Sequence, residues 1–191
     1  MSCTTEQSTP RLPVLDRFLT LWIFMAMVAG VGLAFYEIVK RNPHGINTGI
    51  DLSQGMLEEA KKRLLGIPGA NYTLSIGTAF KLNAQDESVD ILMNNYMFDL
   101  IAFMDMDKIL LEFKRLLKKG GRLVLINMTE GEQFGSGLYD FVYKIYPKAL
   151  GGCRGVKLTD RLQQLGFKVE IREYIQQMLF PSEVILAIRS S

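Results

Sequence analysis

The stretch "INTGIDLSQGMLEEAKKRLLG" (residues 46–66) decides the fold, because a short apolar run passes directly into an amphipathic helix. The run "INTGIDL" carries an acid, Asp51, near its end, and its length and composition are typical of a buried parallel strand. Ser53 follows as an N-cap candidate, and Gly66 ends the helical pattern. The helix has one apolar face, at the spacing of Met56, Leu57, Ala60, Leu64 and Leu65.

The rest of the chain repeats this alternation of strands and helices. Apolar runs predict strands over residues 72–77, 88–98 (buried on both faces), 122–129, 168–174 and 182–189. Helical patterns occupy residues 106–121, 136–150 (aromatic, broken at Pro147) and 157–167, with Thr159 as a cap. We therefore expect an α/β fold with an open, mostly parallel sheet covered on both faces. The last two strands lack a helix between them and should form an antiparallel pair at the sheet edge.

The bulk composition excludes several classes of function. The 191 residues carry a net charge of +2, with Lys and Arg spread along the chain, so we expect no nucleic-acid partner. The two cysteines, Cys3 and Cys153, and the single histidine, His44, form neither a disulfide framework nor a metal-ligand pattern. The sequence predicts no metal site and a reducing, cytoplasmic compartment.

One segment departs from this pattern. Residues 18–36, "FLTLWIFMAMVAGVGLAFY", contain no charged side chain. Nineteen helical residues rise about 28 Å, close to the hydrocarbon thickness of a bilayer. The segment is either a membrane helix, which would hold the protein at the cytoplasmic face of the membrane, or a buried strand followed by a buried helix.

Polar side chains gather where the predicted parallel strands end. In open α/β sheets, ligands bind at the carboxyl ends of the strands. This places Asp51, the segment after Ile76, and the pair Asn94–Asn95 at one rim. The Asp51 carboxylate could accept hydrogen bonds from both hydroxyls of a ribose, or could simply be an acid favoured at a helix N-terminus. For the two asparagines the alternative is hydrogen bonding to the local backbone.

Several segments together resemble the class I S-adenosylmethionine-dependent methyltransferases, in the branch that includes quinone-biosynthesis enzymes. They are "TGIDLSQGMLEEAKKRL" (48–64), "DESVDILMNNYMFDLI" (86–101), "ILLEFKRLLKKGGRLVLINMTEG" (109–131) and the closing "GFKVEIREY…FPSEVILAIR". The resemblance covers about residues 33–189. It implies a Rossmann-like methyltransferase domain over residues 33–191. It also implies in-line transfer of a methyl group from S-adenosyl-L-methionine to a small-molecule or lipid-like acceptor, mainly by alignment of the two reactants.

The resemblance also implies residue roles on the adenosine side of the cofactor. Asp51 would hold the ribose, Leu52 would pack on the adenine, and Thr78 and Ala79 would lie along the adenine edge. The sequence departs from the family at Thr78, where an acid is common. A hydroxyl group binds the adenine amino group less strongly than a carboxylate does.

On the methionine side, Asn94, Asn95 and Tyr96 would face the methionine part of the cofactor or the acceptor. The resemblance assigns no catalytic residue.

The acceptor site is the least defined. The variable segment before the last strands offers Tyr139, Cys153 and Arg154. Tyr139 would line an apolar acceptor pocket or pack in the core, and Cys153 would bind a soft acceptor or be a buried structural thiol. Arg154 would pair with an anionic acceptor or form a surface salt bridge.

The family's glycine-rich loop is incomplete in this chain. Aligned on Gly30-Val31-Gly32, the positions of the family's acid and first glycine hold Ala26 and Val28. Cofactor contacts are still expected at Gly30 and Gly32, because glycine lets the backbone approach a ligand closely.

The N-terminal residues carry a second resemblance. "RLPVLDRFLTLWIFMAMVAGVGLAF" (11–35) resembles the first membrane helix of arsenite efflux permeases. We therefore expect residues 1–32 to be a permease-like segment that replaced the start of the domain. "WIFMAMVA" (22–29) would be either a substitute first strand or part of a membrane helix. The alternative function is a membrane-anchored, catalytically impaired remnant of a gene fusion, with an arsenic-resistance locus as one source.

Overall fold

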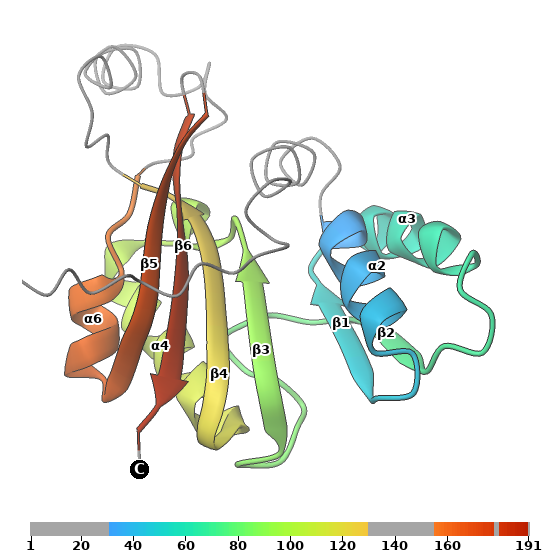
Figure 1. Ribbon diagram of the computed structural model, residues 1–191, viewed down its shortest axis with the longest axis horizontal. Helices are drawn as coiled ribbons and strands as arrows, with labels where there is room; N and C mark the ends of the chain where they lie inside the picture. Colours follow the sequence, from blue (N-terminus) through green and yellow to red (C-terminus); the bar gives the residue numbers. More distant parts are fainter. Residues whose placement is uncertain (1–30, 130–154, 178–179, 191) are drawn as a thin grey trace, which may run out of the picture.

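The computed structural model describes residues 31–129, 155–177 and 180–190. Its helices are α2 (Val31–Arg41), α3 (Gln54–Leu64), α4 (Phe103–Leu116) and α6 (Thr159–Gln164), with a short 3-10 helix, η1 (Phe98–Leu100). Its strands are β1 (Asn47–Asp51), β2 (Tyr72–Ile76), β3 (Val89–Asn95), β4 (Leu117–Met128), β5 (Phe167–Gln177) and β6 (Phe180–Arg189) (Figure 1).

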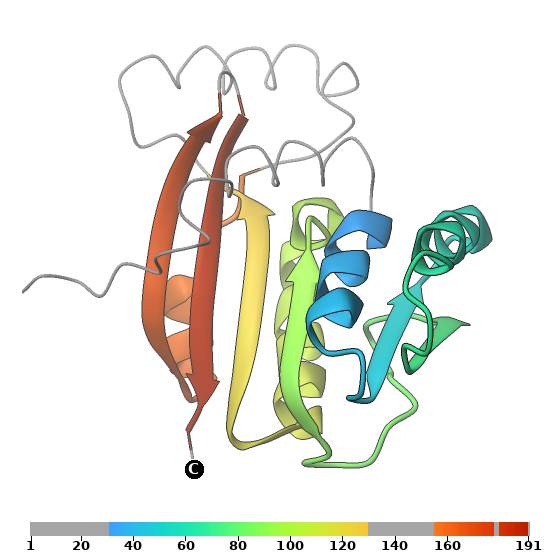
Figure 2. The ribbon, with the colours of Figure 1, turned by 45° about the vertical axis from the view of Figure 1, so that its right-hand side comes forward.

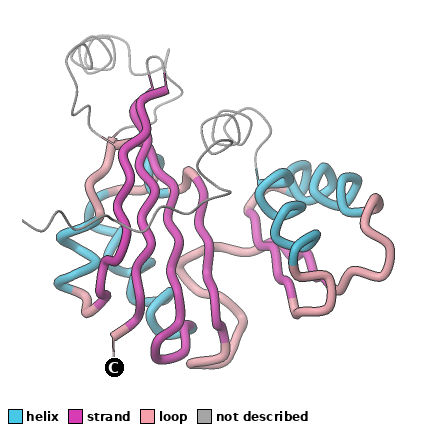
Figure 3. Tube along the Cα trace, viewed as in Figure 1, coloured by secondary structure: helices cyan, strands magenta, loops and turns pink. Residues whose placement is uncertain are grey.

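The described strands form two separate sheets. β1 and β2 pair in parallel, and the second sheet has the order β3-β4-β6-β5. β3 and β4 are parallel, whereas β6 runs antiparallel to both β4 and β5. The predicted α/β class and the closing antiparallel pair are confirmed, with β5 at the sheet edge (Figure 3).

The stretch that decides the fold forms as predicted. The Met56 backbone N–H donates to the Ser53 hydroxyl at 3.4 Å, so Ser53 caps α3. Leu57, Ala60 and Leu64 are buried, but Leu65 is 74% exposed because the helix ends one residue before it.

Gly32 lies in the first turn of α2. A Cβ atom on Gly32 would lie 3.3 Å from the Ala60 Cα, so the glycine lets α2 approach α3 closely. Phe35 and Val39 of α2 pack with Leu64 of α3 over the β1–β2 pair. Gly32 thus makes a helix–helix contact at the point where the glycine loop was predicted to open the first helix, and its cofactor contact stays a prediction.

The main core lies between α4, α6 and one face of the larger sheet (Figure 1). α4 starts three residues earlier and ends five residues earlier than the predicted 106–121. The Gly120–Gly121 pair, predicted to stop the helix, lies inside β4. Gly120 has φ +74° there, and the pairing with β3 shifts register between Leu117 and Arg122.

α6 also departs from its prediction. It covers residues 159–164 rather than 157–167, and its N-cap is Leu158, so Thr159 is the first helical residue and not the cap.

β3 differs most from its prediction. It was expected to be buried on both faces, yet Ile91 is 58% and Met93 36% exposed. Among the described strands, β3 pairs with β4 alone and so stands at the edge of the larger sheet. In two views the β1–β2 pair lies beyond the β3 edge of the larger sheet, with β1 toward β3 (Figure 2). Within the described ranges, no strand pairs with the free edge of β1 or with that of β3.

Of the predicted membrane helix over residues 18–36, residues 18–30 lie outside the described part of the chain. Residues 31–36 belong to α2, which continues past Glu37 and Lys40 to Arg41 and packs against α3. Within the described ranges, no helix has the length and apolar character that a bilayer crossing requires.

Candidate functional site

Asp51 stands at the carboxyl end of β1, opposite Ile76 at the end of β2. Its Oδ1 accepts a hydrogen bond of 2.7 Å from the Ser53 backbone N–H, which turns the chain from the strand into α3. The Asp51 carboxylate is partly exposed, and Leu52 beside it is 75% exposed. The structure thus presents an acid and an apolar side chain together at the rim, as predicted from the sequence.

The loop after β2 brings Thr78 to the same rim, because the Gly77 N–H donates to the Asp51 carbonyl at 3.1 Å. The Thr78 hydroxyl accepts from the Phe80 N–H at 3.3 Å. Ala79 packs against the main core around α4.

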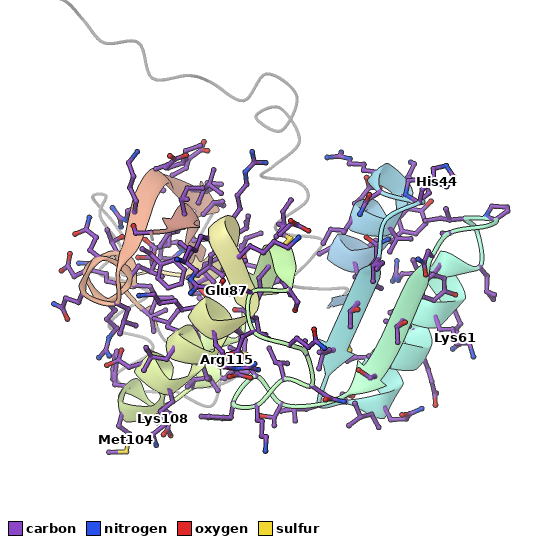
Figure 4. All side chains as sticks on the ribbon, turned by 90° about the horizontal axis from the view of Figure 1, so that it is seen from below. His44, Lys61, Glu87, Met104, Lys108 and Arg115 are labelled. Atoms are coloured by element: carbon purple, nitrogen blue, oxygen red, sulfur yellow. The ribbon has the colours of Figure 1, made fainter. Side chains whose placement is uncertain are left out.

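α4 fixes the position of this loop. The Glu112 carboxylate accepts a hydrogen bond of 2.7 Å from the Leu82 N–H. Arg115 pairs with Glu112 at 2.8 Å and also with Asp86, at the end of α4 beside the loop (Figure 4). The hydrogen bond from Arg115 is the main cause that lowers the pKa of Glu112. An ionised Glu112 therefore ties the rim loop to α4.

The ends of β3 and β4 carry a second set of polar groups. The Asn94 amide nitrogen lies 3.5 Å from the Met97 sulfur, and the buried side-chain oxygens of Asn94 and Asn95 have no hydrogen-bond partner within the described ranges. The roles of Asn94 and Asn95 toward a cofactor therefore stay predictions.

Tyr96 lies directly after β3, and its side chain packs in a small apolar cluster. It has φ +48°, an unusual conformation for a residue other than glycine. Its hydroxyl lies 3.1 Å from the Ser182 hydroxyl, and its ring packs near Ile126 and Ile175. Burial raises the pKa of Tyr96 to about 12, so the phenol stays protonated at neutral pH.

Asp99 was not singled out from the sequence. The residue is 1% exposed, and its Oδ1 accepts from the Met128 N–H at 3.0 Å. Burial is the main cause that raises the pKa of Asp99 to about 7, opposed by its backbone hydrogen bonds. Its Oδ2 has no partner among the residues described.

Two further buried groups lie at the end of β4. Both amide atoms of Asn127 and the hydroxyl of Thr129 are buried, without partners in the described part of the chain. The signal in the sequence was an acid directly after one predicted strand (88–98) and polar residues at the end of the next (122–129).

The remaining predicted residues divide into two groups. Gly30, Tyr139, Cys153 and Arg154 lie outside the described residues, so their roles stay predictions. His44 is exposed in the turn before β1, at the opposite end of that strand from Asp51 (Figure 4). No cluster of three or more His, Cys, Asp or Glu side chains able to hold a metal occurs in the ranges that the structure covers.

The family model described as "Methyltransferase domain" matches residues 27–125, more than half of the chain. A demethylmenaquinone methyltransferase of Thermotoga maritima is 30% identical over 128 residues, which is 66% of this chain and 53% of the relative. The ubiquinone/menaquinone biosynthesis C-methyltransferase UbiE of Campylobacter jejuni is 34% identical over 106 residues, 54% of this chain and 42% of the relative. The chain thus spans about half the length of the curated relatives it matches.

Solved structures show the same fold at low identity. Magnesium protoporphyrin IX methyltransferase (ChlM) of Synechocystis PCC 6803, with bound SAH, gives a TM-score of 0.68 at 15% identity, over 97% of this chain and 90% of the other. A SAM-dependent methyltransferase of Methanosarcina mazei gives 0.64 at 16% identity, over 81% and 85%. The chain therefore has the class I methyltransferase fold.

The family match begins at residue 27, within the apolar run, and includes Gly30 and Gly32. The comparisons give no support to the likeness of residues 11–35 to an arsenite permease or to a membrane-anchored remnant.

Proposed function

Because the chain belongs to the methyltransferase domain family, we propose that it transfers the methyl group of S-adenosyl-L-methionine to a small-molecule or lipid-like acceptor. The observation that carries the proposal is the rim at the end of β1. There, Asp51 presents a partly exposed carboxylate directly before the capped N-terminus of α3. An acid in this place accepts hydrogen bonds from ribose hydroxyls in dinucleotide-binding folds.

The other cofactor contacts follow from the same rim. Leu52, which is exposed beside Asp51, covers the adenine, and the Thr78 hydroxyl binds its edge. Because its side chain packs on the main core, Ala79 contributes its backbone. The side-chain oxygens of Asn94 and Asn95, which have no partner among the described residues, receive the ammonium group of the methionine part.

Within the described ranges β1 and β3 each have an edge without a partner strand, which supports a place for the N-terminal run. Unpaired backbone groups in a sheet interior are costly, and an open edge is prone to pair with another chain. Residues 22–29 ("WIFMAMVA") supply a central strand in this proposal, and Gly30 and Gly32 lie at its carboxyl end. Since the family match starts at residue 27, this arrangement is favoured over the membrane helix.

The acceptor is proposed from the named relatives. Two of them are named for methylation in quinone biosynthesis, so we propose a quinone-like or other largely apolar small molecule. The segment carrying Tyr139, Cys153 and Arg154 completes the acceptor side. We propose the cytoplasm as the location, because an enzyme of this class would encounter its cofactor and acceptor there or at the adjoining face of the membrane.

Calorimetric titration with S-adenosylhomocysteine tests the proposed function. We expect micromolar binding by the full chain and its loss in Asp51→Ala. The matched control is Asp90→Ala, which removes an exposed acid that pairs with Lys118 at the other end of β3. A folded wild-type protein that does not bind S-adenosylhomocysteine would overturn the proposal.

A further inference from the structure

Three buried side chains at the ends of β3 and β4 have polar atoms without partners. Asp99 is 1% exposed, and Asn127 and Thr129 are fully buried. Within the described residues, four atoms of these side chains have no hydrogen-bond partner: Asp99 Oδ2, both amide atoms of Asn127 and the Thr129 hydroxyl oxygen. A buried polar group without a partner costs about 1–3 kcal/mol, so several in one place point to a ligand that completes their hydrogen bonds.

The backbone places these groups together. The Asp99 Oδ1 is bonded at 3.0 Å to the N–H of Met128, which lies between Asn127 and Thr129 in the chain. Asp99 itself follows the carboxyl end of β3 by four residues. All three side chains therefore lie at the strand ends where ligands bind in this type of sheet.

We propose that Asp99 contacts the methyl acceptor and takes the proton from a hydroxyl group on it, with Oδ2 as the accepting atom. This inference rests on the proposed methyl transfer and adds the residue and the acceptor chemistry to it. Asn127 and Thr129 bind further polar atoms of the same molecule.

The step balances with the cofactor already proposed. The hydroxyl O–H bond breaks and its proton goes to Asp99 Oδ2. The oxygen, or a ring carbon conjugated to it, forms the new bond to the methyl carbon. The carbon–sulfur bond of the sulfonium breaks, and its electron pair stays on sulfur, giving neutral S-adenosylhomocysteine. Asp99 later releases the proton to solvent.

The charges around Asp99 suit this role. The groups that act on its carboxyl are Glu183 on β6 and Tyr96 after β3. Glu183 pairs with Arg172 at 2.8 Å, and the Tyr96 phenol remains neutral at physiological pH. Burial with an acid nearby raises the pKa of Asp99 to about 7. A carboxyl group with such a pKa is well matched to proton transfer at neutral pH.

The experiment compares two probes on the full chain loaded with S-adenosylhomocysteine, by calorimetry or ligand-observed NMR. 1-Naphthol carries the hydroxyl donor, and 1-methoxynaphthalene has the same ring system without it. We expect the wild type to bind 1-naphthol about 10-fold more tightly, since a hydrogen bond to a charged group contributes about 1.5–3 kcal/mol and each 1.4 kcal/mol is tenfold. The preference should shrink as the pH falls from 8 to 6 and Asp99 becomes protonated.

Asp99→Asn should abolish the preference while S-adenosylhomocysteine still binds, because the amide oxygen can keep the bond to Met128 and the amide NH₂ donates where Oδ2 accepted. Asp90→Asn, which changes an exposed acid of β3 that pairs with Lys118, should leave the preference unchanged.

Equal binding of the two probes by wild type, no binding of either, or a preference that Asp99→Asn retains would each overturn the inference. If Asp99→Asn does not fold, the wild-type preference and its pH dependence decide alone. Failure of S-adenosylhomocysteine binding is a separate result and counts against the proposed function.

Discussion

The Asp99 carboxylate accepts the backbone hydrogen bond of Met128 at a point of β4 that lies beyond the last residue paired with β3. β3 ends its pairing with β4 at Asn95 and Ile126, and the Tyr96 N–H still reaches the Ile126 carbonyl at 2.8 Å. Two residues further along β4, the Met128 N–H donates to Asp99 Oδ1 at 3.0 Å. A buried backbone donor is thus satisfied by a side chain where the two strands diverge.

This buried acid should make stability depend on pH. The pKa of Asp99 is about 7 in the folded protein and 3.8 as its ordinary value, so the folded state binds more protons between these values. The contribution of Asp99 to the free energy of unfolding is therefore full below about pH 4 and falls as the pH rises to 7. Each pKa unit corresponds to about 1.4 kcal/mol, so the total is on the order of 4 kcal/mol.

Urea unfolding of wild type and Asp99→Asn between pH 4 and 8 measures this effect. The variant keeps an acceptor for Met128 but does not titrate, so its stability relative to wild type should improve steadily with pH. Parallel curves for the two proteins would show that Asp99 does not titrate in this range.

Asp51 should matter for cofactor binding more than for folding. Its carboxylate is partly exposed and accepts one bond, from the Ser53 N–H. We expect Asp51→Asn to keep this turn and the melting temperature but to weaken S-adenosylhomocysteine binding about 10- to 100-fold, as expected when a charge-assisted bond to a hydroxyl is lost. Calorimetry and thermal unfolding on the same samples separate the two effects.

Glu112 should hold the rim loop in place. Glu112→Ala leaves the Leu82 N–H without its 2.7 Å acceptor, at a cost of about 1 kcal/mol or more. The pKa of Glu112 is lowered by Arg115, so this stabilisation is present above pH 4.5 and lost as the pH falls. Hydrogen exchange of the amides in residues 77–88 should accelerate in the variant. Glu59→Ala, which removes an exposed pair with Lys62, should change neither stability nor exchange in that loop.

Two glycines should respond oppositely to alanine. A Cβ atom on Gly49 would lie 2.8 Å from Leu74 Cδ2 and 3.1 Å from the Phe35 ring, so Gly49→Ala should destabilise the fold by about 1–3 kcal/mol. Gly55 lies in α3, with Ser53 Oγ at 3.8 Å as its nearest contact. Gly55→Ala should stabilise by up to about 1 kcal/mol, because alanine favours the helix. Denaturant midpoints compare the two, and a loss of stability in both would contradict the stated packing.

A proline tests the proposed central strand. If residues 22–29 pair between β1 and β3, Phe24→Pro removes a ladder hydrogen bond inside the sheet and should cost more than about 2 kcal/mol in detergent-free buffer. Thr5→Pro, before the apolar run, should have no effect. An unchanged free energy of unfolding in Phe24→Pro would place the run outside the sheet.

Local patterns in the sequence predicted much of this protein. The strand ending at Asp51, the cap at Ser53 and the closing antiparallel pair depend on neighbours in the chain, and all three are confirmed. Helix and strand periodicity and cap chemistry are properties of short segments, which explains why the sequence alone determined the α/β class and the position of Asp51.

The tertiary structure decided what depends on segments far apart. Whether Ile91 is buried depends on which segments pack against its face of β3, and Gly32 contacts a helix only because α3 packs against it. Asp99 becomes a buried, titrating acid only when η1 folds against the end of β4. Burial and the electric field at a carboxyl group are set by atoms distant in sequence, and no local pattern records them.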